Sequence, residues 1–85
     1  MRKWIARVRV MPRSGLLDPQ GSAVEHALTS LGFAQVGRVR VGRTFEIQLV
    51  GASEQAVRDD IKLMCDRLVA NPVTEDYAID TVEAA

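Results

Sequence analysis

The chain has very few of the residues on which most active sites depend. Its 85 residues include one cysteine, Cys65, and one histidine, His26. A single cysteine excludes an intrachain disulfide and a metal site built from several cysteines. Cys65 as a nucleophile with His26 as its base would also need a third group to orient the base, and the sequence offers no such group. We therefore expect a buried thiol and a solvated imidazole.

Surplus charge and long apolar segments are also absent. Lys plus Arg equals Asp plus Glu at 11 each, whereas a protein that grips nucleic acid needs surplus positive charge. No apolar run approaches the ~20 residues needed to cross a bilayer, and the N-terminal MRKWIARVRV lacks the apolar centre of a signal peptide. We expect no nucleic-acid partner, no membrane association and a cytoplasmic location.

The sequence does have a regular order of strand and helix patterns, which predicts a single domain over residues 1–85. Period-2 alternation predicts strands, and apolar spacing of 3.6 residues predicts helices. The resulting β-α-β-β-α-β order predicts an α+β, ferredoxin-like fold, with an antiparallel sheet and two helices on one of its faces. The expected elements are a strand over residues 3–11, a helix over 18–32, strands over 36–41 and 45–50, a helix over 53–71, a strand over 75–82 and a frayed tail over 82–85.

Several side chains have an expected place in these elements. Asp18 is a suitable N-cap and Pro19 a suitable first helical residue, but Gly21 lowers helix propensity and suggests that another backbone or a partner subunit approaches closely. The inner faces should be formed by Trp4, Ala6, Val8 and Val10; by Val24, Ala27, Leu28 and Leu31; and by Val57, Ile61, Met64 and Leu68.

The two middle strands pose a question of register. Val39 and Val41 must share a face with Phe45 and Ile47, and residues directly opposite one another in an antiparallel pair point the same way. A two-residue turn at Gly42-Arg43 would put these side chains on opposite faces. We therefore predict a three-residue loop or a bulge that sets Val41 against Phe45 and Val39 against Ile47.

Other motifs are weaker. Residues 37–44, GRVRVGRT, approach the phosphate-loop pattern, but their alternation predicts a strand rather than a turn before a helix. The side chains of Asp59 and Asp60 point in different directions on a helix. Those of Glu75 and Asp76 point to opposite faces of a strand. Five arginines could form a solvated sheet face or a docking surface for an acidic partner or RNA: Arg7, Arg9, Arg38, Arg40 and Arg43.

Three stretches, in this order and spacing, resemble the PurS family, the small subunit of phosphoribosylformylglycinamidine (FGAM) synthase. They are residues 17–21 with Ala23-Val24, residues 39–43, and residues 64–73 with 75–77. The resemblance covers residues 3–82. One departure is Arg43, where the family usually has lysine. The planar guanidinium group, with its forked N–H donors, there replaces a single ammonium group. The approach to the first helix, residues 13–15, is also less typical of the family.

The resemblance implies a role in purine biosynthesis. The complete ligase converts formylglycinamide ribonucleotide, glutamine and ATP to formylglycinamidine ribonucleotide, glutamate, ADP and phosphate. In the split enzyme, a PurQ subunit releases ammonia from glutamine, and a PurL subunit, where ATP and Mg are expected, activates the amide. A PurS chain then has no catalytic residue, cofactor or metal, and it joins PurL to PurQ as a homodimer or tetramer.

On this basis we expect partner contacts at the constrained segments. An alternative is a small ferredoxin-like regulatory domain that binds a small ligand at a dimer interface. An RNA-binding sheet would need exposed aromatic residues on its central strands, which the pattern does not provide. The candidate contact residues are Asp18, Pro19, Gln20, Gly21, Arg40, Gly42, Arg43, Asn71, Pro72, Glu75, Asp76 and Tyr77.

Overall fold

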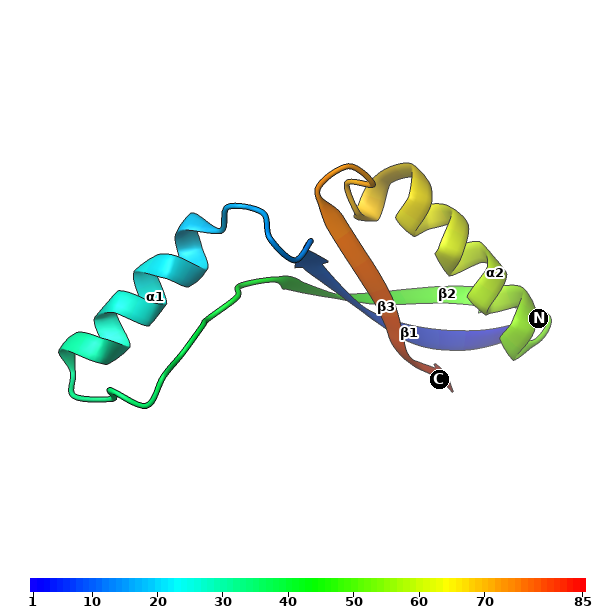
Figure 1. The fold of residues 1–85 in the computed structure, drawn as a ribbon. Helices are drawn as coiled ribbons and strands as arrows, with labels where there is room; N and C mark the ends of the chain where they lie inside the picture. The colour runs from blue at the N-terminus through cyan, green and yellow to red at the C-terminus, as the bar shows by residue number, and fades with distance from the viewer.

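Two parts make up the protein in the computed structural model, which describes residues 1–85 (Figure 1). The body is a sheet with one helix over it, and the arm, residues 13–42, projects from one end of that sheet. The elements are β1 (Arg2–Pro12), α1 (Pro19–Ser30), β2 (Arg43–Gly51), α2 (Glu54–Met64), a π-helical turn η1 (Cys65–Val69) and β3 (Glu75–Ala84). The α+β class and the antiparallel sheet are confirmed.

The sheet has the order β2-β1-β3, so β1 is its central strand. Both neighbours run antiparallel to β1, with Val8 opposite Phe45 on one side and opposite Ile79 on the other. The register between β1 and β3 shifts between Arg7 and Val8. Because the chain supplies no fourth strand, the outer edges of β2 and β3 are both open.

The core lies between the inner face of the sheet and α2. The predicted inner-face residues of β1 are all buried, and Val57 and Ile61 of α2 pack against them without any exposure. Trp4 also donates its indole N–H to the carbonyl of Gly51, at 3.2 Å. Burial of apolar surface is the main stabilising term in a body of this kind.

The helix over the sheet begins as predicted and then changes phase. The Ser53 hydroxyl accepts from the N–H of Ala56, at 3.2 Å. Cys65, four residues after Ile61 and the first residue of η1, is fully buried on the same inner face. Met64 and Leu68 were predicted to face the core; this is wrong, since they are 37% and 86% exposed. A π-helical turn holds more residues than an α-helical turn, so Leu68, within η1, leaves the 3.6-residue spacing. Met64 precedes η1 and falls outside the buried row of Val57, Ile61 and Cys65, which recurs every four residues.

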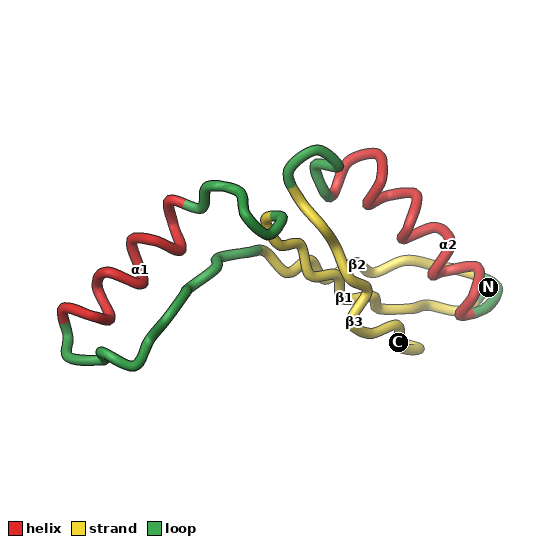
Figure 2. Tube along the Cα trace, in the orientation of Figure 1, coloured by secondary structure: helices red, strands yellow, loops and turns green.

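The arm departs from the expected layout. Only α2 lies over the sheet, while α1 lies beyond the sheet's end (Figure 1). Residues 36–42 do not form a strand within the chain, and they run beside α1 back to β2 as an extended loop (Figure 2). The predicted hairpin between residues 36–41 and 45–50 is therefore not formed.

The C-terminal end is more ordered than predicted. β3 continues through the segment in which we expected fraying, and Trp4 pairs with Ala84. The N–H of Ala85 donates to the carbonyl of Lys3, at 2.9 Å. No helix has both the length and the apolar character needed to cross a membrane.

The phase of α2 and η1 can be tested by truncating one buried and one exposed side chain. Ile61→Ala should lower the free energy of unfolding by about 2–5 kcal/mol, because it leaves a cavity in the core. Leu68→Ala should change it by no more than about 0.5 kcal/mol. Urea titration at one fixed protein concentration measures both; equal losses would contradict the assigned phase.

Candidate functional site

The three family-like stretches meet at the base of the arm. A groove of about 360 Å³ there is lined by residues from all three. The structure thus brings together half of the predicted contact residues, which are far apart in the sequence. The candidates that line this groove are Asp18, Pro19, Gln20, Gly42, Arg43 and Glu75.

Asp18 accepts hydrogen bonds both from the start of α1 and from residues 36–42, the segment that returns to β2. One carboxylate oxygen accepts from the N–H of Gly21 and the other from the N–H of Val41, both at 3.0 Å. The N-cap and Pro19 at the start of the helix are as predicted. These two N–H donors, that of Gly21 first, lower the pKa of the Asp18 carboxyl below its usual value, because they stabilise its charged form.

Gly21 permits the close approach of a backbone within the same chain. It is the one buried residue of α1, and a Cβ there would overlap the carbonyl oxygen of Val39. The N–H of Val39 in turn donates to the Glu25 carboxylate, at 3.1 Å. The glycine that the sequence left unexplained thus allows residues 36–42 to lie against α1, and the backbone that approaches it belongs to the same chain.

A second close approach occurs where the arm joins the sheet. A Cβ at Gly42 would overlap the carbonyl oxygen of Val10 and the sulfur of Met11. The Arg40 guanidinium donates to the carbonyl of Pro12. These contacts hold the outgoing and returning segments of the arm together at its base.

Arg43 joins this base to the far end of η1. Its two terminal nitrogens meet the two oxygens of Glu75, at 2.7 and 2.9 Å, and one of them also approaches the carbonyl of Val69. Glu75 accepts from the N–H of Asn71 as well, at 2.8 Å. The hydrogen-bonded pair raises the pKa of Arg43 and lowers the pKa of Glu75. Lysine could not make this forked contact.

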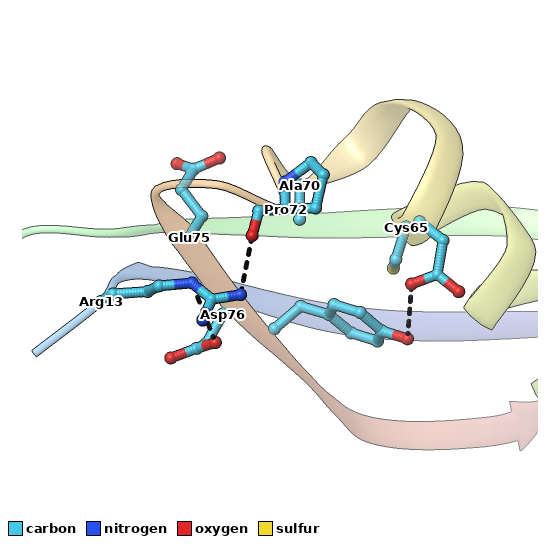
Figure 3. A pocket seen from close by; sticks show the side chains of 8 residues that line it. Arg13, Cys65, Ala70, Pro72, Glu75 and Asp76 are labelled. Carbon is cyan, nitrogen blue, oxygen red and sulfur yellow. Dashed lines mark hydrogen bonds and ion pairs between the residues drawn. The ribbon is translucent and has the colours of Figure 1, made fainter.

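A smaller pocket of about 190 Å³ lies under the end of η1 (Figure 3). Arg13 bridges two predicted contact residues there: it donates to the Pro72 carbonyl at 2.7 Å and lies 3.6 Å from the Asp76 carboxylate. The Tyr77 hydroxyl donates to Asp66 at 3.2 Å. The pocket thus brings together Pro72, Glu75, Asp76 and Tyr77 around Arg13, a residue that no sequence pattern had indicated as a contact.

No reactive combination of side chains appears at either place. Burial raises the pKa of the Cys65 thiol, which keeps it protonated and unreactive. His26 is exposed on α1, in the arm, whereas Cys65 lies in the body, so the two do not form a pair. No three His, Cys, Asp or Glu side chains come together in a way that could hold a metal ion.

Three of the five arginines are paired with carboxylates, Arg43 with Glu75 and two others on the sheet. On the sheet face opposite α2, Arg7 lies near Glu46 and Glu83, and Arg9 lies 3.3 Å from Asp80. Trp4 is buried and Phe45 and Tyr77 pack against the core, so the sheet presents no aromatic platform. This arrangement suits contact with a protein better than contact with RNA.

Comparisons with known proteins agree on one family. The PurS family model, described as phosphoribosylformylglycinamidine (FGAM) synthase, matches residues 5–83. The PurS subunit from Bacillus subtilis is 40% identical over 91% of this chain and 90% of its own length. The structure of Thermus thermophilus PurS has a TM-score of 0.84 at 37% identity, over 95% of both chains. A chain in the structure of PurLQS from Thermotoga maritima has a TM-score of 0.84 at 25% identity, over 100% of both chains.

The contact between Gly21 and Val39 leads to a mutational prediction. Gly21→Ala should lower the free energy of unfolding by about 1–3 kcal/mol, despite the better helix propensity of alanine, because the added methyl overlaps the Val39 carbonyl. Gly37→Ala is the matched control, since a Cβ at Gly37 meets nothing within 4 Å. Thermal and urea unfolding measure both variants, and an unchanged Gly21→Ala protein would refute the contact.

The bonds to Asp18 lead to a pH prediction. Because its pKa is lower in the folded chain, the carboxylate contributes stability above its usual pKa of 3.8, and this contribution is lost as the pH falls through the folded value. Asp18→Asn should remove that part of the acid dependence. Unfolding titrations between pH 7 and pH 3 on both proteins measure it; parallel curves would contradict the assignment.

Proposed function

The chain belongs to the PurS family and is a subunit of FGAM synthase, and we propose that it joins PurQ to PurL there without a catalytic residue of its own. The observation that supports this most is the full-length match to a chain of the PurLQS structure, in which the relative is assembled with PurL and PurQ. FGAM synthase acts in purine biosynthesis, so the role of this chain is to support that reaction.

The geometry at the base of the arm supports a joining role. Asp18, Gly42 and Arg43 are each held by contacts to other segments, so little conformational entropy remains to be lost when a partner binds. The same groove exposes Pro19 and Gln20. A rigid link between two subunits also raises the effective concentration of ammonia near its acceptor.

The remaining parts of the proposal concern location and partners. We propose that the chain acts as a homodimer in the cytoplasm, where a free buried cysteine stays reduced. ATP and Mg then bind to the PurL subunit, and this chain holds no cofactor. The paired arginines and the zero net charge favour protein partners over nucleic acid.

The proposed role predicts that the reaction needs this chain when glutamine supplies the ammonia but not when ammonium chloride does. Purified PurL and PurQ should make FGAM from glutamine only when this chain is added, because ammonia must otherwise diffuse between separate subunits. PurL with ammonium chloride should need neither PurQ nor this chain. Product formation measured in both reactions tests this. Glutamine-dependent turnover that is the same without the chain would refute the joining role, as would glutamine hydrolysis by the chain alone.

A further inference from the structure

The arm is joined to the body at one place. The chain leaves the sheet after Pro12 and returns to it at Arg43, and α1 lies beyond the sheet's end (Figure 1). Apart from the bond from Arg40 to the Pro12 carbonyl, every hydrogen bond and ion pair between the arm and the body starts from Arg13. The direction in which the arm projects therefore depends strongly on the contacts of this one residue.

Arg13 reaches the segment of residues 70–76, which leads from η1 into β3. Its backbone N–H donates to the carbonyl of Thr74, at 2.8 Å, and its guanidinium donates to the carbonyl of Pro72, at 2.7 Å (Figure 3). The Asp76 carboxylate lies 3.6 Å from the guanidinium. Several separate attachments fix both position and rotation, whereas a single attachment leaves a pivot. Arg13 therefore holds the outgoing side of the arm at a set angle.

Asn71 gives this segment the shape that the contacts of Arg13 need. The side-chain carbonyl oxygen of Asn71 accepts from the N–H of Val73, at 3.0 Å, which is the local bond of an Asx turn. Its backbone carbonyl accepts from the N–H groups of Thr74 and Glu75, at 3.2 and 2.8 Å. These bonds fold the segment back on itself, so that two of its carbonyls are available to Arg13.

The returning side of the arm is anchored to the same segment. At the start of β2, Arg43 meets both oxygens of Glu75, at 2.7 and 2.9 Å. Glu75 also accepts from the N–H of Asn71, at 2.8 Å. The two points at which the arm meets the body, residues 13 and 43, are therefore both attached to the segment that Asn71 shapes.

The attachment through Arg13 is suited to direct the arm rather than to stabilise the fold. The side chains of Arg13 and Asp76 are 47% and 67% exposed, and exposed ion pairs contribute little to the free energy of unfolding. The buried core between α2 and the sheet includes neither side chain. A contact that adds little stability but joins two parts of a molecule acts mainly on how those parts are oriented.

Building on the joining role proposed above, we propose that Arg13 is a positioning residue for the glutamine-dependent synthesis of FGAM. Its contacts with residues 72–76 set the angle between the arm and the body. That angle decides how PurQ and PurL lie relative to one another when this chain joins them. Because the guanidinium donates within its own chain, Arg13 acts through the arm rather than by contact with a partner. Asn71 supports this role by shaping the segment that Arg13 binds.

Distances between the arm and the body test the effect on geometry. Spin labels at two exposed sites, Ser30→Cys on α1 and Asp60→Cys on α2, report the angle, and an excess of unlabelled chain restricts each measured distance to one chain. The native cysteine is fully buried and stays unlabelled. Arg13→Ala should at least double the width of the distance distribution or shift its centre, because the arm then pivots. Arg9→Ala is the matched control, since the ion pair that it loses, 3.3 Å from Asp80, lies within the sheet.

Turnover from glutamine tests the consequence for the reaction. With PurL and PurQ present, a saturating concentration of Arg13→Ala should give a maximum rate of FGAM formation at least fivefold below that of the parent. A lost partner contact would instead raise the concentration of chain needed for half the maximum rate. Arg13→Lys, which keeps a donor for the Pro72 carbonyl, should recover at least half of the loss, and Arg9→Ala should match the parent. Asn71→Ala should fall between the parent and Arg13→Ala in both measurements.

The proposal is overturned if Arg13→Ala keeps the distances of the parent, if it keeps the maximum rate, or if more chain restores that rate. Urea unfolding checks that Arg13→Ala is as stable as Arg9→Ala; if it is not, Arg13→Lys and Asn71→Ala decide the question. If the parent supports glutamine-dependent turnover and Arg13→Ala does so equally well, the positioning role fails alone. If turnover does not depend on the chain, the proposed function fails, and the distances still show whether Arg13 sets the angle.

Discussion

The pairing of β1 with strands on both sides is the interaction on which the rest of the structure depends. It places the alternating residues of β1 in one row, and α2 covers that row with Val57 and Ile61. With only 11 of 85 residues buried, the body has few other sources of cohesion. The same strand also sets the position of the arm, since the chain leaves the sheet at the end of β1 and returns at the start of β2.

The body could be predicted from sequence because its determinants are local. Period-2 alternation in β1 and the Ser53 cap of α2 each act within a few residues, and each was found in the structure. Which residues of α2 and η1 face the sheet could not be predicted in this way. Met64 and Leu68 fit the 3.6-residue period, whereas the buried row of Val57, Ile61 and Cys65 recurs every four residues as the helix packs on the sheet.

The arm could not be predicted because its pattern fits two arrangements equally well. Val39 and Val41 share a face with Phe45 and Ile47 both in a hairpin with an odd-numbered loop and in a straight continuation of one strand. The choice depends on contacts distant in sequence: Gly21 against the Val39 carbonyl, and Gly42 against Val10.

The candidate site was found from the sequence in part. The predicted residues at the base of the arm do meet there, but their internal connections were not apparent. Glu25 and Arg13 were missed, since nothing in their spacing relates them to Val39 or to Pro72. Arg43 was recognised only as a departure from lysine. Its geometric reason, the fork that meets both oxygens of Glu75, becomes visible only when residues 43 and 75 lie together.

The two ends of the chain lie together at the end of the sheet remote from α1 (Figure 1). The Ala85–Lys3 hydrogen bond and the start of β1 fix them there. An affinity tag, a fluorophore or a surface tether attached to either terminus is therefore held away from the arm. The protein can be immobilised or labelled through its ends while the arm stays fully open to solution.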